Sequence, residues 1–123
     1  MKDKIYEYLK SKGCILILGF GREGMSTYHF IRSIDSNVKL GISDLNEIHD
    51  NDVLQDPNVQ LYSGEHYLDA CYEYDVIIKG PGVIIKDYLP KDVREKITCQ
   101  TDLFVQFAIA KTIGITGTKG KGT

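Results

Sequence analysis

The sequence predicts an α/β fold, in which a parallel sheet carries helices on both of its faces within a single domain. Short apolar runs alternate along the chain with stretches of helical spacing, and this alternation is typical of a parallel sheet. Glycine-rich breaks follow several of these runs directly. Because ligands of such sheets bind beyond the carboxyl ends of the strands, we expect the breaks to meet at one edge. The length of 123 residues suits one domain with its own core.

The first half of the chain is predicted to contain two helices and three strands. Residues 1–12 mix charges with apolar positions and lack the apolar core of a signal peptide, which indicates a short amphipathic helix. Residues 14–18 form a compact apolar run of strand length, and residues 23–33 place apolar side chains at helical spacing. Residues 38–42 and 59–62 are predicted as two further short strands.

The second half continues the same alternation. Residues 74–79 are rich in branched apolar side chains and are predicted as a strand, ended by a glycine-proline-glycine break. Residues 87–96 are predicted as a helix and residues 97–99 as a short strand. Residues 102–110 carry apolar side chains at helical spacing, and residues 112–116 are predicted as the last strand.

Composition excludes several classes of protein. The net charge of −2 gives no overall attraction to nucleic acid or to an anionic membrane. No apolar run approaches the roughly 20 residues that cross a bilayer. The three cysteines are odd in number and widely spaced, so we expect no disulfide, and we expect Cys14 to be a small core residue. We therefore expect a cytoplasmic protein, monomeric, without a membrane or nucleic-acid partner.

The first glycine-rich break has the spacing of a nucleotide-binding turn. Gly19, Gly21 and Gly24 form a G-x-G-x-x-G pattern between a predicted strand and a predicted helix. The pattern provides a tight turn, a close approach of phosphate to the backbone and close packing of helix on strand. Asp44 follows the second predicted strand, where dinucleotide-binding folds place an acid on the ribose. These features favour a Rossmann-like nucleotide-binding domain, although a structural tight turn is the plainer alternative.

Two features make a dinucleotide uncertain as the ligand. The predicted helix begins with Arg22 and Glu23, which place a cation and an acid beside the anion site. The carboxyl-terminal end of the chain also has features that a dehydrogenase does not need. An NAD(P)-binding domain of a dehydrogenase or regulatory protein nevertheless remains an alternative.

The second glycine-rich segment indicates the start of a phosphate-binding P-loop. It follows the strand predicted at 112–116 and carries a Gly-Lys pair, Gly120-Lys121, whose lysine reaches terminal phosphates in such loops. Ile115 stands where the general pattern has its first glycine, and Gly122 stands where a hydroxyl residue normally binds magnesium. A flexible lysine-rich tail is the plainer alternative.

A P-loop leads into a helix whose N-terminus faces the phosphates. The sequence ends before that helix, so we expect a piece of a longer protein that cannot hold ATP by itself. We accordingly expect residues 1–111 to form a first domain and residues 112–123 to begin a second, ATP-binding domain.

Two phosphate-type loops about a hundred residues apart are the layout of the Mur ligases, which this chain resembles. Residues 113–121 are similar to the ATP loop of that family. Residues 15–26 resemble the opening strand and glycine turn of its D-glutamate-adding members, and residues 42–44 resemble their second strand with its terminal acid. Residues 80–83 match their Ser-Pro-Gly loop, with Gly80 in place of the serine, and residues 102–104 resemble the helix before the ATP loop.

The resemblance covers about residues 13–123 and implies a UDP-sugar-binding N-terminal domain. In the family this domain holds the UDP part of UDP-N-acetylmuramoyl-L-alanine, a peptidoglycan precursor. The residues that the resemblance assigns to it are Gly21, Arg22, Glu23, Asp44, Leu45, Asn46 and Gly82. The ATP loop would comprise Gly117, Thr118, Lys119, Gly120, Lys121, Gly122 and Thr123.

The family's reaction uses ATP and Mg²⁺ to activate the substrate carboxylate as an acyl phosphate, which the amine of D-glutamate then attacks. Its catalytic groups and its D-glutamate site belong to later domains, so the resemblance places no catalytic residue in this chain and implies no activity for it alone. Gly122 departs from the family's loop and puts the usual magnesium ligand in doubt. Another Mur ligase, such as the alanine-adding one, and a relative that has lost the cell-wall role are alternatives.

Overall fold

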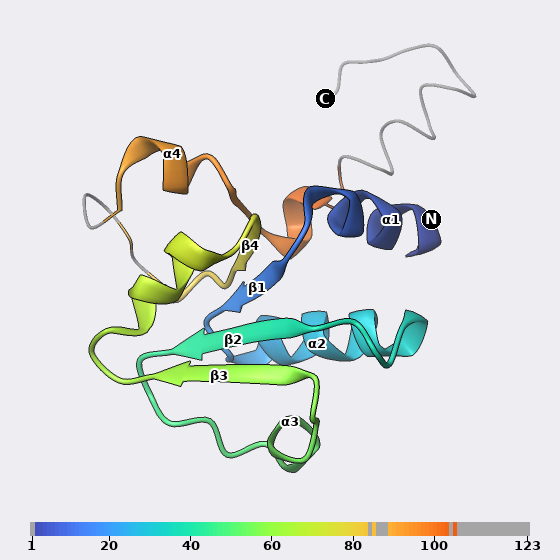
Figure 1. Ribbon diagram of the computed structural model, residues 1–123, viewed down its shortest axis with the longest axis horizontal. Helices are drawn as coiled ribbons and strands as arrows, with labels where there is room; N and C mark the ends of the chain where they lie inside the picture. The colour runs from blue at the N-terminus through green and yellow to red at the C-terminus, as the bar shows by residue number, and fades with distance from the viewer. Residues whose placement is uncertain (1, 84, 86–88, 104, 106–123) are drawn as a thin grey trace.

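The computed structural model describes residues 2–83, 85, 89–103 and 105 of the chain. Helices and strands alternate along these residues (Figure 1). Their order is α1 (Lys2–Lys12), β1 (Ile15–Leu18), α2 (Arg22–Ile34), β2 (Leu40–Asp44), α3 (Asn51–Leu54), β3 (Val59–Ser63), the 3-10 helix η1 (Tyr67–Glu73), β4 (Val76–Lys79), α4 (Lys91–Arg94) and β5 (Ile97–Thr98).

The strands form one parallel sheet of five in the order β3-β2-β1-β4-β5. The central strand β1 pairs Ile17 with Ile42 of β2 on one side and with Ile78 of β4 on the other. All four residues of β1 are buried, as expected of a parallel strand covered on both faces. The strand order reverses between β1 and β4, and this switch point is where open α/β sheets bind their ligands.

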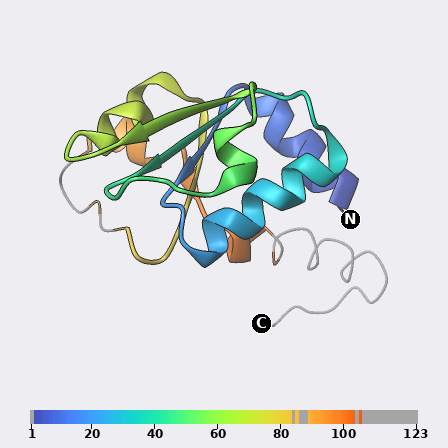
Figure 2. The ribbon, with the colours of Figure 1, turned by 90° about the horizontal axis from the view of Figure 1, so that it is seen from below.

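Helices cover both faces of the sheet, which confirms the predicted fold class. Ile15 and Ile17 of β1 pack into a core with α1, α2 and α3, whereas Leu16 and Leu18 pack into a second core with η1 and α4. This division follows from the alternation of side chains along a strand. Figure 2 shows α2 and α3 on one side of the sheet and η1 on the other.

The differences from the predicted elements concern short or marginal segments. Strand β2 begins at Leu40 instead of residue 38, and β4 begins at Val76 instead of residue 74. Neither α3 nor η1 was predicted, because elements of one or two turns show no hydrophobic period. Within the helix predicted at 87–96 the structure describes only one α-helical turn, α4.

The carboxyl-terminal predictions are tested only in part. Residues 100–103 and 105 are helical, which agrees with the start of the helix predicted at 102–110. The rest of that helix and the strand predicted at 112–116 lie outside the described residues. The expectation that Cys14 is a core residue was wrong: Cys14 precedes β1 and is exposed, whereas Cys71 of η1 is buried. Burial raises the pKa of the Cys71 thiol to about 11.

A cluster of charged and phenolic side chains fixes the C-terminal end of α2. Arg32 donates from Nε to Asp56 Oδ2 at 2.7 Å, and Tyr28 donates its hydroxyl to the same oxygen at 2.8 Å. Burial raises the pKa of Asp56, but hydrogen bonds from Arg32, the Asn58 amide and Tyr28 lower it more, so it lies below its usual value. Burial and the bond to Asp56 raise the pKa of Tyr28 to about 12. This polar cluster ties α2 to the turn before β3.

Candidate functional site

An open hollow lies at the carboxyl ends of β1, β2 and β4, at the switch point of the sheet. Its volume is about 420 Å³, within the range of small-molecule sites. Its walls come from the three segments that follow these strands and from the start of η1. The lining residues are Gly19, Gly21, Arg22, Glu23, Gly24, Asp44, Leu45, Asn46, Tyr67, Gly80, Pro81, Gly82 and Val83.

The glycine turn after β1 forms one wall. Gly19 has a φ of +90°, a conformation that glycine adopts without strain. A Cβ atom on Gly24 would collide with the carbonyl oxygen of Gly19 and touch Ile17, so the start of α2 lies directly against the strand. A Cβ atom on Gly21 would meet no atom within 4 Å among the described residues, so its open side adjoins the hollow. The protein's own packing therefore requires Gly24 but leaves the space at Gly21 free.

Helix α2 begins in this wall, with Gly21 as its N-cap. Among the described residues, no side chain accepts a hydrogen bond as a cap of this helix. The first amides of a helix have no partner within the helix, and they carry the positive end of its dipole. Their position beside Gly21 makes the hollow suitable for an anion.

Asp44 links the glycine turn to the segment after β2. Its Oδ2 accepts a hydrogen bond from the Phe20 amide at 2.6 Å, and its Oδ1 accepts one from the Asn46 amide at 2.8 Å. The carboxylate thus orients both walls of the hollow at once. Beside it, Leu45 is 56% exposed and offers an apolar surface at the rim.

The loop after β4 forms the opposite wall. The Gly80 amide donates to the Leu18 carbonyl at 2.9 Å, which continues the pairing of β4 with β1. A Cβ atom on Gly19 would lie 2.6 Å from a methyl group of Val83, so this loop is seated on the glycine turn. Pro81 and Gly82 at its tip are exposed.

The structure brings all seven residues predicted for UDP-sugar binding to this hollow. Sequence reasoning missed Tyr67, which lies at the start of an unpredicted 3-10 helix. The other lining residues belong to the glycine turn and to the loop at 80–83, which the sequence analysis had singled out. The seven residues of the predicted ATP loop, 117–123, lie outside the described residues, so that loop stays a prediction.

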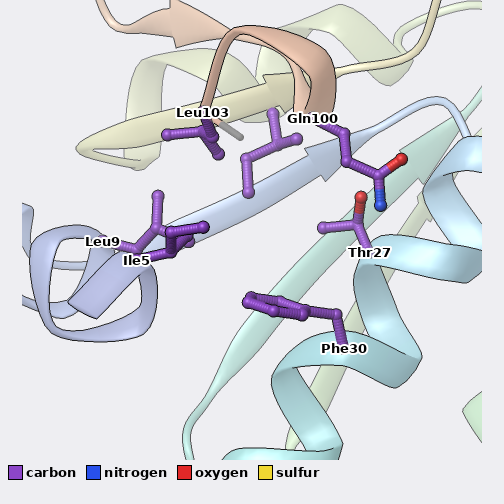
Figure 3. A pocket seen from close by; sticks show the side chains of 7 residues that line it. Ile5, Leu9, Thr27, Phe30, Gln100 and Leu103 are labelled. Carbon is purple, nitrogen blue, oxygen red and sulfur yellow. The ribbon is translucent and has the colours of Figure 1, made fainter. Parts of the chain in front are cut away.

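Two other hollows are weaker candidates. The one in Figure 3 lies between α1, α2 and the helical residues 100–103, and apolar side chains such as Ile5, Phe30 and Leu103 surround most of it. Its volume of about 10 Å³ fits no more than a water molecule. A second hollow lies at the amino ends of the strands beside Lys39, Gln60 and Tyr74, on the edge of the sheet where such folds do not bind ligands.

The site is charged and its charged side chains are exposed or half-buried. Arg22 is exposed and Glu23 is half-buried, and neither forms an ion pair with any described residue.

Within the described part of the chain, no three histidine, cysteine, aspartate or glutamate side chains are grouped as metal ligands would be. No described helix is long and apolar enough to cross a membrane.

The sheet order and the glycine turn at its switch point place the chain among the Rossmann-like α/β domains. Comparison with known proteins then identifies its relatives. The chain is 31% identical over 135 aligned residues to the UDP-N-acetylmuramoylalanine–D-glutamate ligase of Clostridium botulinum, covering 98% of this chain and 27% of the relative. The ligase of the same name from Clostridium kluyveri is 28% identical, with 98% of this chain and 27% of the relative covered.

A third such ligase, from Ligilactobacillus salivarius, is 27% identical over 116 residues, which are 89% of this chain and 25% of the relative. These matches confirm the resemblance to the N-terminal domain of a D-glutamate-adding Mur ligase. The chain spans about a quarter of the length of these curated relatives. No family model matches the chain, and no solved structure matches it significantly.

Proposed function

We propose that the chain is the UDP-sugar-binding domain of an ATP-dependent ligase that adds D-glutamate to UDP-N-acetylmuramoyl-L-alanine. One observation carries this proposal. The seven residues that the resemblance assigns to the sugar nucleotide come from segments after three different strands, yet all of them line one hollow. They are separated by up to 61 positions in the chain, from Gly21 to Gly82, so nothing local in the sequence brings them together.

Each wall offers a different part of a nucleoside diphosphate a suitable contact. The free amides at the start of α2, with Arg22 beside them, suit the diphosphate. The segment after β2 offers the Asn46 side chain and the exposed Leu45 to a base and ribose. Gly82 presents bare backbone from the opposite loop. A UDP group would thus lie across the switch point, between β1 and β4.

The further steps of the reaction are proposed for the complete protein. ATP, Mg²⁺ and D-glutamate would bind to domains beyond this one, with residues 112–123 leading into the ATP-binding domain. The product would be a precursor of peptidoglycan, and the first domain would contribute affinity and orientation for the sugar nucleotide.

Asp44 does not by itself distinguish a dinucleotide from a uridine nucleotide. In NAD-binding folds the acid after the second strand accepts hydrogen bonds from the ribose hydroxyls. Here both oxygens of the Asp44 carboxylate already accept backbone amides, from Phe20 and Asn46. The carboxylate holds the two walls together, and each of its oxygens can still accept a hydroxyl of a ribose, so the titration with NADH has to separate the two ligands.

The proposal is tested by an NMR titration of the ¹⁵N-labelled chain with UDP-N-acetylmuramoyl-L-alanine, UDP and NADH in parallel. We expect both uridine nucleotides to shift the amides of Gly21, Glu23, Asn46 and Gly82, and NADH to leave them unchanged. Shifts with NADH alone would overturn the proposal in favour of a dehydrogenase-type domain.

A matched control separates specific binding from general attraction of anions. Lys91 on α4 is 83% exposed and does not line the hollow. Lys91→Met removes one positive charge without touching the hollow, so it should leave UDP affinity unchanged, whereas Arg22→Met should weaken it about tenfold, a typical value for a charge-assisted contact. Equal weakening in both variants would contradict a specific site.

A further inference from the structure

Lys79 is the last residue of β4 and lies immediately before the loop that forms one wall of the hollow. Its side chain is half-buried and does not itself line the hollow. The ammonium group donates hydrogen bonds to the Gly80 carbonyl at 3.1 Å and to the Val83 carbonyl at 2.9 Å. The lysine thus binds the carbonyls of both the first and the last residue of the Gly80–Val83 loop.

These two bonds act together with the other contacts of the loop. The Val83 amide donates to the Gly80 carbonyl at 3.3 Å, and the Gly80 amide donates to the Leu18 carbonyl at 2.9 Å. The Val83 side chain in turn packs against Gly19. One of its methyl groups lies 2.6 Å from the position that a Cβ atom on Gly19 would occupy. Holding the Val83 carbonyl therefore also holds the Val83 side chain on the glycine turn.

The lysine also changes the electrostatics of the rim. Gly80 and Val83 both line the hollow, and a carbonyl oxygen directed into it would repel a diphosphate. Because both oxygens lie within hydrogen-bond distance of the Lys79 ammonium, they are directed to the lysine, and its positive charge offsets their negative ends. The loop then presents the exposed Gly82 to the ligand.

From these contacts we propose that Lys79 is a positioning residue of this site, which holds the Gly80–Val83 loop in the conformation that accepts a nucleoside diphosphate. The ligand class rests on the function proposed above. The positioning role rests on the lysine's own hydrogen bonds and is observable without a ligand.

The test compares Lys79→Met, which keeps the aliphatic stem but removes the donors, with Lys79→Arg, which keeps charge and donors. Lys91→Met serves as the control for the loss of one positive charge. Without ligand, we expect the hydrogen-bonded amides of Gly80 and Val83 to exchange hydrogen about tenfold faster in Lys79→Met, because the loop loses its two fixed carbonyls. UDP affinity should fall about tenfold in Lys79→Met and recover at least in part in Lys79→Arg, since a loosened loop must be ordered on binding.

The outcomes distinguish this proposal from the function on which its ligand class rests. If the unaltered chain binds no UDP, the proposed ligand is wrong, and the exchange rates alone decide the role of Lys79. If Lys79→Met shows unaltered exchange in the loop and binds UDP as the unaltered chain does, the positioning role is overturned.

A measurement on the unaltered chain covers the case in which Lys79→Met does not fold. An ammonium held by two carbonyls exchanges its protons slowly and gives an observable NMR signal in ¹⁵N-lysine-labelled protein. We expect that signal for Lys79 and not for the exposed Lys91. Its absence for Lys79 would overturn the proposal as well.

Discussion

The two ends of helix α2 each carry an arginine, and the two arginines have opposite environments. At the N-terminal end, Arg22 is exposed beside an open hollow and forms no ion pair among the described residues. At the C-terminal end, the side chain of Arg32 is 11% exposed and bonds to Asp56, to the Asp35 carbonyl and to the Asn58 carbonyl. One end leaves its donors available, and the other end uses them within the fold.

The difference separates groups that stabilise the domain from groups that are available to a ligand. The charges around Arg32 are neutralised by partners on other elements, so they contribute to the stability of the domain. The Arg22 guanidinium and the first amides of α2 lack such partners in the described part of the chain, so an incoming anion can become their hydrogen-bond partner. Arginine content alone cannot distinguish the two ends, but their hydrogen bonds can.

The largest expected effect comes from exchanging the two arginines for methionine. Arg32→Met should lower the free energy of unfolding by about 3 kcal/mol, because it leaves the nearly buried Asp56 carboxylate without its cation, held only by the Tyr28 hydroxyl and the Asn58 amide. Arg22→Met should change it by no more than about 0.5 kcal/mol, as surface substitutions do. Urea denaturation of both variants measures the difference. A large loss of stability in Arg22→Met would show that this end, too, has a structural role.

A smaller effect is expected from adding one methyl group at either of two glycines near the start of α2. Gly24→Ala should destabilise the domain by about 1–3 kcal/mol, because the new Cβ collides with the Gly19 carbonyl. Gly21→Ala should cost less, no more than about 1 kcal/mol, since its Cβ meets nothing within 4 Å among the described residues and only the preference of the N-cap for glycine over alanine is lost. In Gly21→Ala we expect the main loss to appear in UDP affinity, measured by calorimetry. Unaltered affinity there would place the ligand away from the turn.

The smallest effect is a pH dependence confined to the Arg32 end. The folded state lowers the pKa of Asp56 below its usual value of 3.8, so the stability linked to it is present above that pH and is lost as the pH falls through the folded-state pKa. Urea midpoints should therefore fall below pH 4 more steeply for the unaltered chain than for Asp56→Asn. The exposed Asp92→Asn should follow the unaltered chain. If the urea midpoints of all three proteins fall equally steeply with pH, Asp56 does not contribute to the loss of stability in acid.

The sequence was sufficient for the sheet because its central strands carry strong, local signals. Residues 15–18 are four consecutive branched apolar residues that match β1, and a glycine ends them. The start of β2 was misplaced because Val38 is apolar and packs on the core, yet strand pairing begins only at Leu40. The turns α3 and η1 depend on tertiary packing of single residues such as Val53 and Cys71, for which sequence periodicity gives no signal.

The candidate site was predictable where a motif marks it and not where backbone atoms build it. The glycine spacing and the acid after β2 identified residues that now line one hollow. The role of Lys79 could not be predicted, because its partners are carbonyl oxygens, which every residue has. The bonds from Asp44 to the Phe20 and Asn46 amides were equally invisible, since they depend on how two loops meet in space.

Because the walls of the hollow are attached to three different strands, the site exists only while the whole sheet is assembled. A ligand of this site therefore binds the native state and not the unfolded chain, and its binding energy is added to the stability of the entire domain. At a ligand concentration one hundred times the dissociation constant, this linkage raises the free energy of unfolding by about 2.7 kcal/mol. The melting temperature of the chain thus becomes a measure of ligand affinity, and it reports weak binding without any catalytic turnover.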